Sequence, residues 1–428
     1  MSTRAERFRY VGLDVTPTSV VGHYELDGRD FAERVEFEGT DDLRDPGASS
    51  VAELWYLLAG LSYYKAGAAR TIDVGDTSLG VAGARLLEAA VHDGLGEFAF
   101  CNDLLLDDVS IEGGREVARL EATLDPARVL VPFGGGIDSV VTVEELNGDL
   151  DESLFIVSPV GGRFDALEAT AAVTGRDIVR ATRTLDPALL RGDTRFFNGH
   201  VPVTAMVTLL ASVAALASGR GGVVMSNEHS ASAPNMRWHG HDVNHQWSKS
   251  WDAEVLIGDA LGERVGDHLV VASFLRDRSE LWVARQFSRL GAYHHVFRSC
   301  NRAFTQDRDR REAAWCGECD KCLFINLVLA PFLDRDELRS IFDGEPLSDP
   351  RRLEQLRALV GVGLGHKPFE CVGDPDESAV ALVQVSQMPR WADVTALGDI
   401  ARSTSADRDV DELLRPQGPT RVPAHWLR

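Results

Sequence analysis

Apolar and polar residues alternate with a period of two in three stretches near the start of the chain, and this pattern predicts β-strands. The predicted strands cover residues 8–15, 20–26 and 31–37. Two later stretches, 52–66 and 81–91, have the apolar spacing of amphipathic helices. Residues 1–125 are therefore expected to form an N-terminal α+β domain. Lys65, at the end of the first helix, could contact an anionic ligand, but an amphipathic helix end also explains it and is preferred.

After residue 126, short β-branched runs alternate with helical patterns, which indicates a mostly parallel sheet covered by helices on both faces. The predicted strands are 129–131, 154–157, 177–180, 223–226, 268–274 and 295–297. The predicted helices between them are 140–147, 166–173, 202–217 and 279–290. The expected fold class is α/β, with a mostly parallel, doubly wound sheet in a domain at 126–300. A C-terminal helical region with cysteines is expected at 301–402, and a polar, partly loose tail at 403–428.

The 428 residues include 66 acidic and 44 basic side chains, which gives a net charge of −22. Binding to nucleic acid or to an anionic membrane needs a basic face, so neither is an expected partner. The longest apolar stretch, 201–217, is interrupted by Pro202 and by hydroxyl side chains, and does not predict a membrane span. The first residues do not lead into an apolar signal segment, and the expected location is the cytoplasm.

Three consecutive glycines, Gly134, Gly135 and Gly136, separate a predicted strand from a predicted helix, and Asp138 and Ser139 begin that helix. In such a loop the backbone N–H groups turn inward, and the helix N-terminus adds partial positive charge, so an anion such as phosphate can bind. The loop lacks the lysine of a Walker A motif and the glycine spacing of a dinucleotide fold. A tight turn without a ligand is the alternative.

A long polar segment, 226–252, follows another predicted strand and is expected at the same sheet edge as the glycine loop. It carries Asn227, Glu228 and four histidines, beginning with His229, and it adds Arg237 and Lys249 as local cations in an acidic protein. Loops of this length are usually functional, and substrate binding is favoured over metal binding because no tight helical ligand spacing occurs. A solvated surface loop is the alternative.

Four of the six cysteines lie close together in the sequence: Cys300, Cys316, Cys319 and Cys322. Two successive C-x-x-C steps can bring three thiolates to one centre, and Cys300 can complete a tetrahedral set. Four sulfur ligands suit a structural Zn²⁺, with an iron–sulfur cluster as the less favoured interpretation. Free reduced thiols are the alternative, because so few cysteines in a long chain do not indicate a disulfide framework.

Glycine and proline residues punctuate the stretch 363–373, which carries His366, Lys367, Glu370 and Cys371. This composition predicts a rigid loop that presents polar groups, although the signal is weak when it is taken alone. Helical patterns on both sides could place the loop over one face of the middle domain.

The loop Gly134–Ser139 resembles the S-G-G-x-D-S pyrophosphate loop (PP-loop) of the ATP pyrophosphatases, except that Gly134 replaces the first serine. The glycine loop, the polar segment, the cysteine cluster and the H-K-P-F-E-C-V-G stretch together resemble the UDP-N-acetylmuramoyl-L-alanyl-L-glutamate epimerase (MurL) family. The resemblance is strongest from residue 128 to 375. It implies a PP-loop-like fold and a UDP-muramoyl dipeptide as the small-molecule substrate.

The resemblance further implies ATP-dependent inversion of the terminal L-Glu to D-Glu in peptidoglycan precursor synthesis, with release of AMP and pyrophosphate. A functional link to a muramoyl-peptide ligase is expected as well. Adenylation would remove the negative charge of the carboxylate, and a side-chain base could then take the neighbouring α-proton. ATP and Mg²⁺ are therefore the expected cofactors, beside a structural Zn²⁺.

In that reaction the glycine loop is expected to hold pyrophosphate with Mg²⁺, and Asp138 and Ser139 to orient the phosphates and the metal. Asp138 is therefore counted among the catalytic residues. Basic side chains suit phosphate or carboxylate binding better than proton transfer. The residues expected to bind the substrate are Asn227, Arg237, Lys249, His366 and Lys367, and Lys249 is also expected at the ATP phosphates.

The sequence leaves the proton-transferring groups open. Glu228 and His229 are candidates near the nucleotide edge, and Cys371 is another. Cys101 could act as a second thiol opposite Cys371, but a buried structural role is preferred for it.

Two other functions remain open. The first is another substrate-adenylating PP-loop enzyme, such as an amidotransferase-like ligase or a 7-cyano-7-deazaguanine synthase, although the cysteine spacing is tighter in the latter. The second is a nucleotide-binding regulator without turnover, which the crowded polar segment 226–252 argues against.

Overall fold

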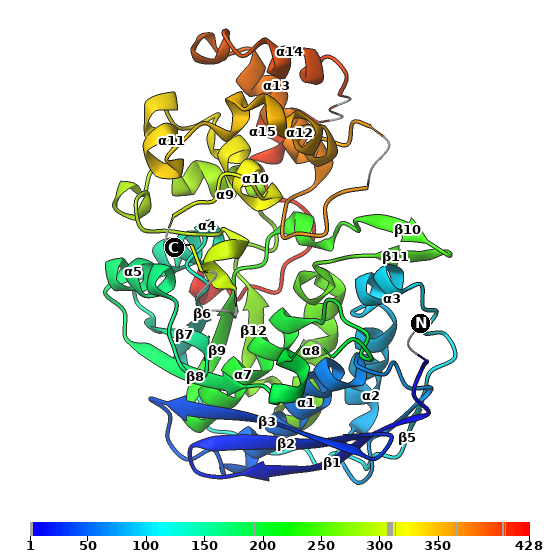
Figure 1. The fold of residues 1–428 in the computed structure, drawn as a ribbon. Coiled ribbons are helices and arrows are strands. Elements are labelled where there is room, and N and C mark those ends of the chain that lie inside the picture. The colour runs from blue at the N-terminus through cyan, green and yellow to red at the C-terminus, as the bar shows by residue number, and fades with distance from the viewer. Residues whose placement is uncertain are drawn as a thin grey trace.

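A ten-stranded sheet forms the framework of the protein, and the C-terminal helices gather at one end of it (Figure 1). This computed structural model describes residues 3–191, 193–305, 311–312, 314–363, 366–404, 406 and 408–428. The strand order is β12-β9-β6-β7-β8-β3-β2-β1-β4-β5. The strands are β1 (Arg7–Val15), β2 (Ser19–Leu26), β3 (Arg29–Glu38), β4 (Thr71–Asp73), β5 (Ser110–Glu112), β6 (Asp125–Pro132), β7 (Asp151–Pro159), β8 (Ile178–Thr184), β9 (Arg220–Met225) and β12 (Val270–Ser273).

Helices cover both faces of the sheet, and a small hairpin of β10 (Met236–Trp238) and β11 (His241–Val243) stands apart from it. The helices of the first 300 residues are α1 (Pro46–Tyr64), α2 (Gly80–His92), α3 (Gly96–Asn102), α4 (Ile137–Glu145), α5 (Asp165–Thr174), α6 (Pro187–Leu190), α7 (Val203–Ala217), α8 (Trp251–Val265) and α9 (Glu280–Phe287). Those of the C-terminal region are α10 (Asp320–Leu329), α11 (Arg335–Phe342), α12 (Leu353–Leu359), α13 (Pro375–Ser386), α14 (Thr395–Ala401) and α15 (Val410–Leu413). In the described part of the chain, no helix has the length and apolar character needed to cross a bilayer.

The parallel strands are buried on both faces, which explains their nearly continuous apolar sequences. In β6, Leu130 packs into one core with α1, α7 and α8, whereas its neighbours Val129 and Val131 pack into a second core with α4, α5 and α9. The same alternation separates Val223 from Val224 in β9. Successive side chains of a strand point to opposite faces, so the two cores lie on the two sides of the sheet.

The order of the parallel strands places a topological switch point at the glycine loop. From β6 the chain proceeds to β7 and β8 on one side, and then returns to place β9 on the other side of β6. Ligands of open α/β sheets bind at such a switch point, outside the carboxyl ends of the strands. The loop after β6 and the polar segment after β9 both begin at this place.

The predicted mixed α/β architecture with a mostly parallel sheet is confirmed, and the strands of the first 40 residues match their predicted positions within two residues. The strand predicted at 295–297 is wrong, because these residues form turns and coil after a short 3-10 helix, Gly291–Tyr293. Phe297 is nevertheless fully buried, which explains the apolar signal. Strands β1–β3 extend the same sheet through the pairing of β3 with β8, so the domain boundary proposed at residue 125 lies within one continuous sheet.

One further expectation differs from the structure. Cys101 is exposed on α3 rather than buried, because it lies on the outer side of this short helix. Most described residues of the tail are exposed or half-buried, and the fully buried side chains of Leu413 and Trp426 attach it to the rest of the protein. Trp426 stands so close to Gly222 of β9 that a Cβ atom at residue 222 would lie 2.8 Å from its ring.

Candidate active site

The glycine loop has the conformation that its sequence predicts. Gly135 has a φ of +72°, which a residue with a side chain rarely adopts, and Gly136 caps the N-terminus of α4. The Ser139 hydroxyl donates to the Gly136 carbonyl oxygen at 3.2 Å. Asp138 lies in the first turn of α4, and its Oδ1 atom is buried without a hydrogen-bond partner among the described residues. Backbone N–H groups, a helix N-terminus and an unpaired carboxylate oxygen therefore converge here.

The segment after β9, the strand next to β6, supplies a second set of polar groups. The Glu228 carboxylate caps a short 3-10 helix, His229–Ser232, by accepting from the Ala231 amide at 3.1 Å. The Asn227 amide donates to Ser273 Oγ at 3.0 Å. Buried Arg276 donates to the carbonyl oxygens of Glu228 at 3.0 Å and Lys249 at 2.7 Å, and thereby joins the two ends of the polar segment.

Cys371 lies among basic groups that favour its thiolate. Burial opposes ionisation of the thiol most strongly, but the charge of Lys249 and the charge and hydrogen bonding of His245 lower the pKa of Cys371 to about 5. The pKa of Lys249 is in turn raised, because Cys371, Glu228 and Asp138 outweigh its burial. A thiolate is therefore held next to an ammonium group at neutral pH.

His245 connects Cys371 with the N-terminal part of the chain. Its Nδ1 atom is hydrogen-bonded to the Glu97 carboxylate of α3, and its ring lies 4.3 Å from the ring of His200. Although burial lowers the pKa of His245, Cys371 and Glu97 together raise it to about 9. Burial and the charge of His245 lower the pKa of His200 to about 3, so His200 is neutral. The side chains of Glu97, His245 and Cys371 thus form a row of alternating charge.

Asp138 belongs to the same electrostatic group. Burial raises the pKa of Asp138 to about 6, with Glu228 adding to the shift and Lys321 and Lys249 opposing it. We call Asp138, Glu228, His245, Lys249 and Cys371 the reactive cluster. It brings the glycine loop, both ends of the polar segment and the 363–373 loop to one place.

Buried ionisable groups surround the reactive cluster. Burial lowers the pKa of Lys367, whose Nζ atom has no hydrogen-bond partner among the described residues. Burial raises the pKa of Glu377 to about 8 and that of Glu280 well above its usual range. Perturbed pKa values at a sheet crevice are typical of functional sites.

Three of the residues predicted for the site belong neither to the reactive cluster nor to the groups described around it. The Arg237 side chain, on the β10–β11 hairpin, is 75% exposed and donates to the Gly240 carbonyl oxygen at 3.2 Å. His229 faces Gly418, and burial lowers its pKa. His366 is exposed, and its ring packs against the aromatic rings of Phe100 and Phe369.

The four predicted cysteines come together in one cluster, and their sulfur atoms all lie within 4.8 Å of one another. The Sγ atom of Cys322 is 3.4 Å from that of Cys319 and 3.6 Å from that of Cys316. Four thiols at this spacing fit the donor set of a tetrahedral zinc site. The cluster lies at the start of α10, and the neighbouring Lys321 amide donates to Glu370 in the Cys371 loop at 2.8 Å.

The sequence did not predict that Glu97, His200 and His245 form part of the site. His245 stands inside the polar segment, four residues before Lys249, so its position gave a usable signal. Glu97 and His200 lie in stretches without any motif, and only the tertiary fold brings them to His245.

A family model described as the MurL N-terminal domain matches residues 1–274, and one described as the MurL C-terminal domain matches residues 296–414. No solved structure matches the chain significantly.

Three curated relatives bear the name UDP-N-acetyl-alpha-D-muramoyl-L-alanyl-L-glutamate epimerase. Those of Salinispora tropica and a Micromonospora species are 37% and 38% identical, each across 98% of this chain and 94% and 96% of their own lengths. The relative from Xanthomonas oryzae pv. oryzae is 36% identical, across 88% of this chain and 84% of its own length. With similarity of this extent and family models matched along most of its length, the chain belongs to the MurL family.

Proposed function

We propose that this protein is an ATP-dependent epimerase that inverts the terminal L-Glu of UDP-N-acetylmuramoyl-L-Ala-L-Glu to D-Glu. The relatives named for this activity support the substrate and the isomerisation. The observation that carries the mechanism is the Cys371 thiolate, which lies in one electrostatic group with Asp138 of the glycine loop. A base for carbon acid chemistry and a site for phosphate thus adjoin each other.

The chemistry explains why these two parts belong together. The α-proton of glutamate is very weakly acidic, because its removal would place a second negative charge beside the carboxylate. When the carboxylate oxygen attacks the α-phosphorus of ATP, pyrophosphate leaves and the mixed anhydride no longer carries the carboxylate charge. The α-proton is then acidic enough for a side-chain base to remove it. On the same grounds we propose that the chain belongs to the PP-loop ATP pyrophosphatase superfamily.

The glycine loop would hold the leaving pyrophosphate through its inward N–H groups and the N-terminus of α4. The unpaired Oδ1 atom of Asp138 fits a Mg²⁺ ligand, and the ion would supply charge neutralisation at the phosphates. Lys249, at the centre of the reactive cluster, would stabilise negative charge on the adenylated carboxyl group. Lys367 offers a second, unpaired ammonium group for the substrate.

Cys371 would take the α-proton. The thiolate becomes a thiol, and the electron pair of the C–H bond passes into an enolate of the acyl adenylate. The reactive cluster favours the thiolate through His245 and Lys249, so no prior deprotonation is needed at neutral pH. Return of a proton to the opposite face and hydrolysis of the anhydride would give D-Glu and AMP.

The four-cysteine cluster would hold a structural Zn²⁺. This ion would fix the start of α10 and, through the Lys321–Glu370 hydrogen bond, the loop that carries Cys371. The wider assignment, to peptidoglycan precursor synthesis in the cytoplasm beside a muramoyl-peptide ligase, follows from the substrate.

The test is incubation of the purified protein with UDP-N-acetylmuramoyl-L-Ala-L-Glu, ATP and Mg²⁺ in D₂O, followed by hydrolysis and chiral analysis of the glutamate. We expect D-Glu with deuterium at the α-carbon, together with AMP. An Asp138→Asn variant keeps the size of the side chain and should form no AMP while it retains the wild-type circular dichroism spectrum. If folded protein that binds ATP returns unlabelled L-Glu, the epimerase assignment is wrong.

A further inference from the structure

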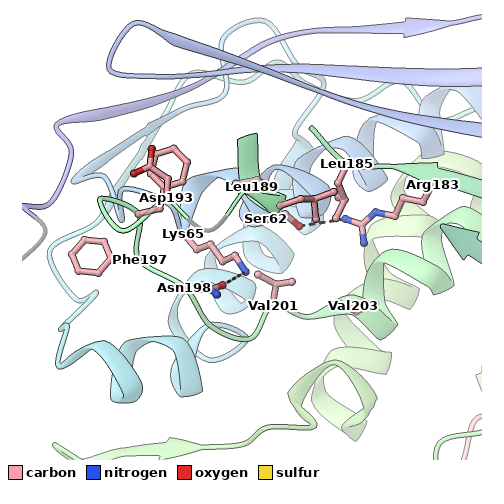
Figure 2. A pocket seen from close by; sticks show the side chains of 12 residues that line it. Ser62, Lys65, Arg183, Leu185, Leu189, Asp193, Phe197, Asn198, Val201 and Val203 are labelled. Atoms are coloured by element: carbon pink, nitrogen blue, oxygen red, sulfur yellow. Dashed lines mark hydrogen bonds between the residues drawn. The ribbon is translucent and has the colours of Figure 1, made fainter. Parts of the chain in front are cut away.

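A cavity of about 440 Å³ lies between the end of α1, the end of β8 and the segment that precedes α7 (Figure 2). Lys65 and Ser62 line it from α1, and Arg183 from β8. Asn198 and Phe197 close it from the third side. Its volume is within the range of about 300–1,000 Å³ that is usual for small-molecule sites.

Lys65 gives this cavity a positive group without a charged partner. Its Nζ atom donates to the Gly199 carbonyl oxygen at 2.7 Å and to Asn198 Oδ1 at 3.3 Å, and both acceptors are neutral. An ammonium group has three N–H donors, so one remains for a ligand. No carboxylate of the described residues forms an ion pair with Lys65, and burial and then Arg183 lower its pKa. Arg183 itself is neutralised by the buried Glu33.

The cavity is connected to the reactive cluster by a row of side chains. Lys65 acts electrostatically on His200, which follows the cavity-lining Asn198 by two residues. The ring of His200 lies against that of His245, and His245 interacts with Cys371. The row relates the cavity to Cys371, and a long ligand with one end at Cys371 would have to pass His200 to reach Lys65 with its other end.

We propose that this cavity binds the nucleoside diphosphate end of the substrate, with the diphosphate at Lys65. The apolar part of the lining, which includes Phe197, Leu189 and Val201, provides a wall for the flat base. This inference rests on the proposed function, because it assigns a place to the part of the UDP-muramoyl dipeptide that does not react. Binding energy from such a remote part serves to position the reacting glutamate.

The proposal is tested with UDP alone, by calorimetric titration of the full chain without ATP. Lys65→Met keeps the length of the side chain but removes the charge, and should weaken UDP binding about ten-fold or more, as expected for the loss of a charge-assisted hydrogen bond. Arg191→Gln is the matched control, since Arg191 is an exposed cation in the same segment that does not line the cavity. It should leave UDP binding unchanged.

A second variant, Val201→Phe, fills the cavity without altering charge and should weaken UDP binding as well. In turnover, Lys65→Met should raise KM for the UDP-linked substrate, while the kinetics with N-acetylmuramoyl-L-Ala-L-Glu, which lacks UDP, stay as in the wild type. Unchanged thermal melting of both variants would exclude unfolding as the cause.

Three results would overturn the inference: no UDP binding by the wild type, equal effects of Lys65→Met and Arg191→Gln, or a parallel loss of ATP affinity. The last result would make the cavity the site of the ATP nucleoside. UDP binding is measured without turnover, so it remains informative even if the protein shows no epimerisation. Conversely, epimerisation with undiminished UDP affinity in Lys65→Met would reject the subsite alone.

Discussion

The imidazole of His245 is hydrogen-bonded to the carboxylate of Glu97, across 148 residues of sequence. Glu97 comes from the N-terminal part of the chain, and His245 faces Cys371 from the C-terminal part. Cys371 and Glu97 raise the pKa of His245 against the effect of burial, so the imidazolium persists beside the thiolate at neutral pH. In the proposed mechanism, this arrangement gives the N-terminal region a role in proton transfer.

Replacement of Cys371 by serine should separate the two halves of the reaction. A serine hydroxyl is too weakly acidic to form the anion at neutral pH, so epimerisation should fall by about 10²-fold or more. Adenylation does not need the thiol, and AMP formation should continue. Chiral analysis and AMP release, measured on the same samples, check this prediction. Cys101→Ser, at an exposed thiol, should behave as the wild type; undiminished epimerisation by Cys371→Ser would contradict the assignment.

The pH profile of kcat/KM should be bell-shaped. The base must be ionised, so activity should rise as pH increases through the pKa of Cys371, about 5. The partner imidazolium is lost as pH increases through the pKa of His245, about 9, and activity should then fall. Asp138, with a pKa of about 6, is expected to steepen the acidic limb. A profile that is flat between pH 4 and 10 would contradict the ion pair.

The variant Glu97→Gln isolates the contribution of the N-terminal region. It removes a negative charge that favours the imidazolium, so the pKa of His245 should fall and the alkaline limb should move to lower pH. A residue with a purely structural role would lower the rate at every pH and leave the limb in place. The pH dependence of deuterium incorporation in D₂O-containing buffers measures the shift.

The glycine loop offers a matched pair of substitutions. A Cβ atom at Gly134 would meet nothing within 4 Å, so Gly134→Ser, which restores the PP-loop serine, should leave stability unchanged and preserve or strengthen ATP binding. A Cβ atom at Gly136 would lie 2.7 Å from Ser299 Oγ. Gly136→Ala should cost about 1–3 kcal/mol of stability and weaken ATP binding. Chemical denaturation and ATP titration test both; equal effects would refute this packing.

Removal of one cysteine should reveal whether the cluster holds metal. Elemental analysis should find about one zinc per chain in the wild type and little in Cys322→Ser. Because the ion would fix α10, the variant should also melt at a lower temperature. The Cys101→Ser variant should retain the metal and the melting temperature. Metal-free wild-type protein with full activity and stability would reject the zinc assignment.

Local patterns predicted the parts of the fold that depend on local physics. The glycines and Asp138 predict the loop, because only certain residues fit its backbone. The spacing of Cys316, Cys319 and Cys322 predicts their cluster. Contacts set by tertiary packing left no such trace. Glu97 is one acidic residue among 66, and only the position of α3 distinguishes it.

The polar segment shows where composition misleads. Its cations seemed to form one set, but His239 and Gly240 both have positive φ and turn the chain into the β10–β11 hairpin, which carries Arg237 outward. Lys249, beyond the hairpin, points back to Cys371. Arg237 and Lys249 carry the same charge in the sequence, and the turn between them determines that only Lys249 reaches the site.

The pairing of β3 with β8, from Arg34 opposite Thr184 to Glu38 opposite Arg180, fastens the N-terminal strands to the parallel sheet by backbone hydrogen bonds. A joint of this kind does not act as a hinge, so the N-terminal strands and the strands around the glycine loop should move as one body during turnover. Two fluorescent labels, one on β2 and the other on α5, should therefore report the same separation before ATP is added, during the reaction and after product release.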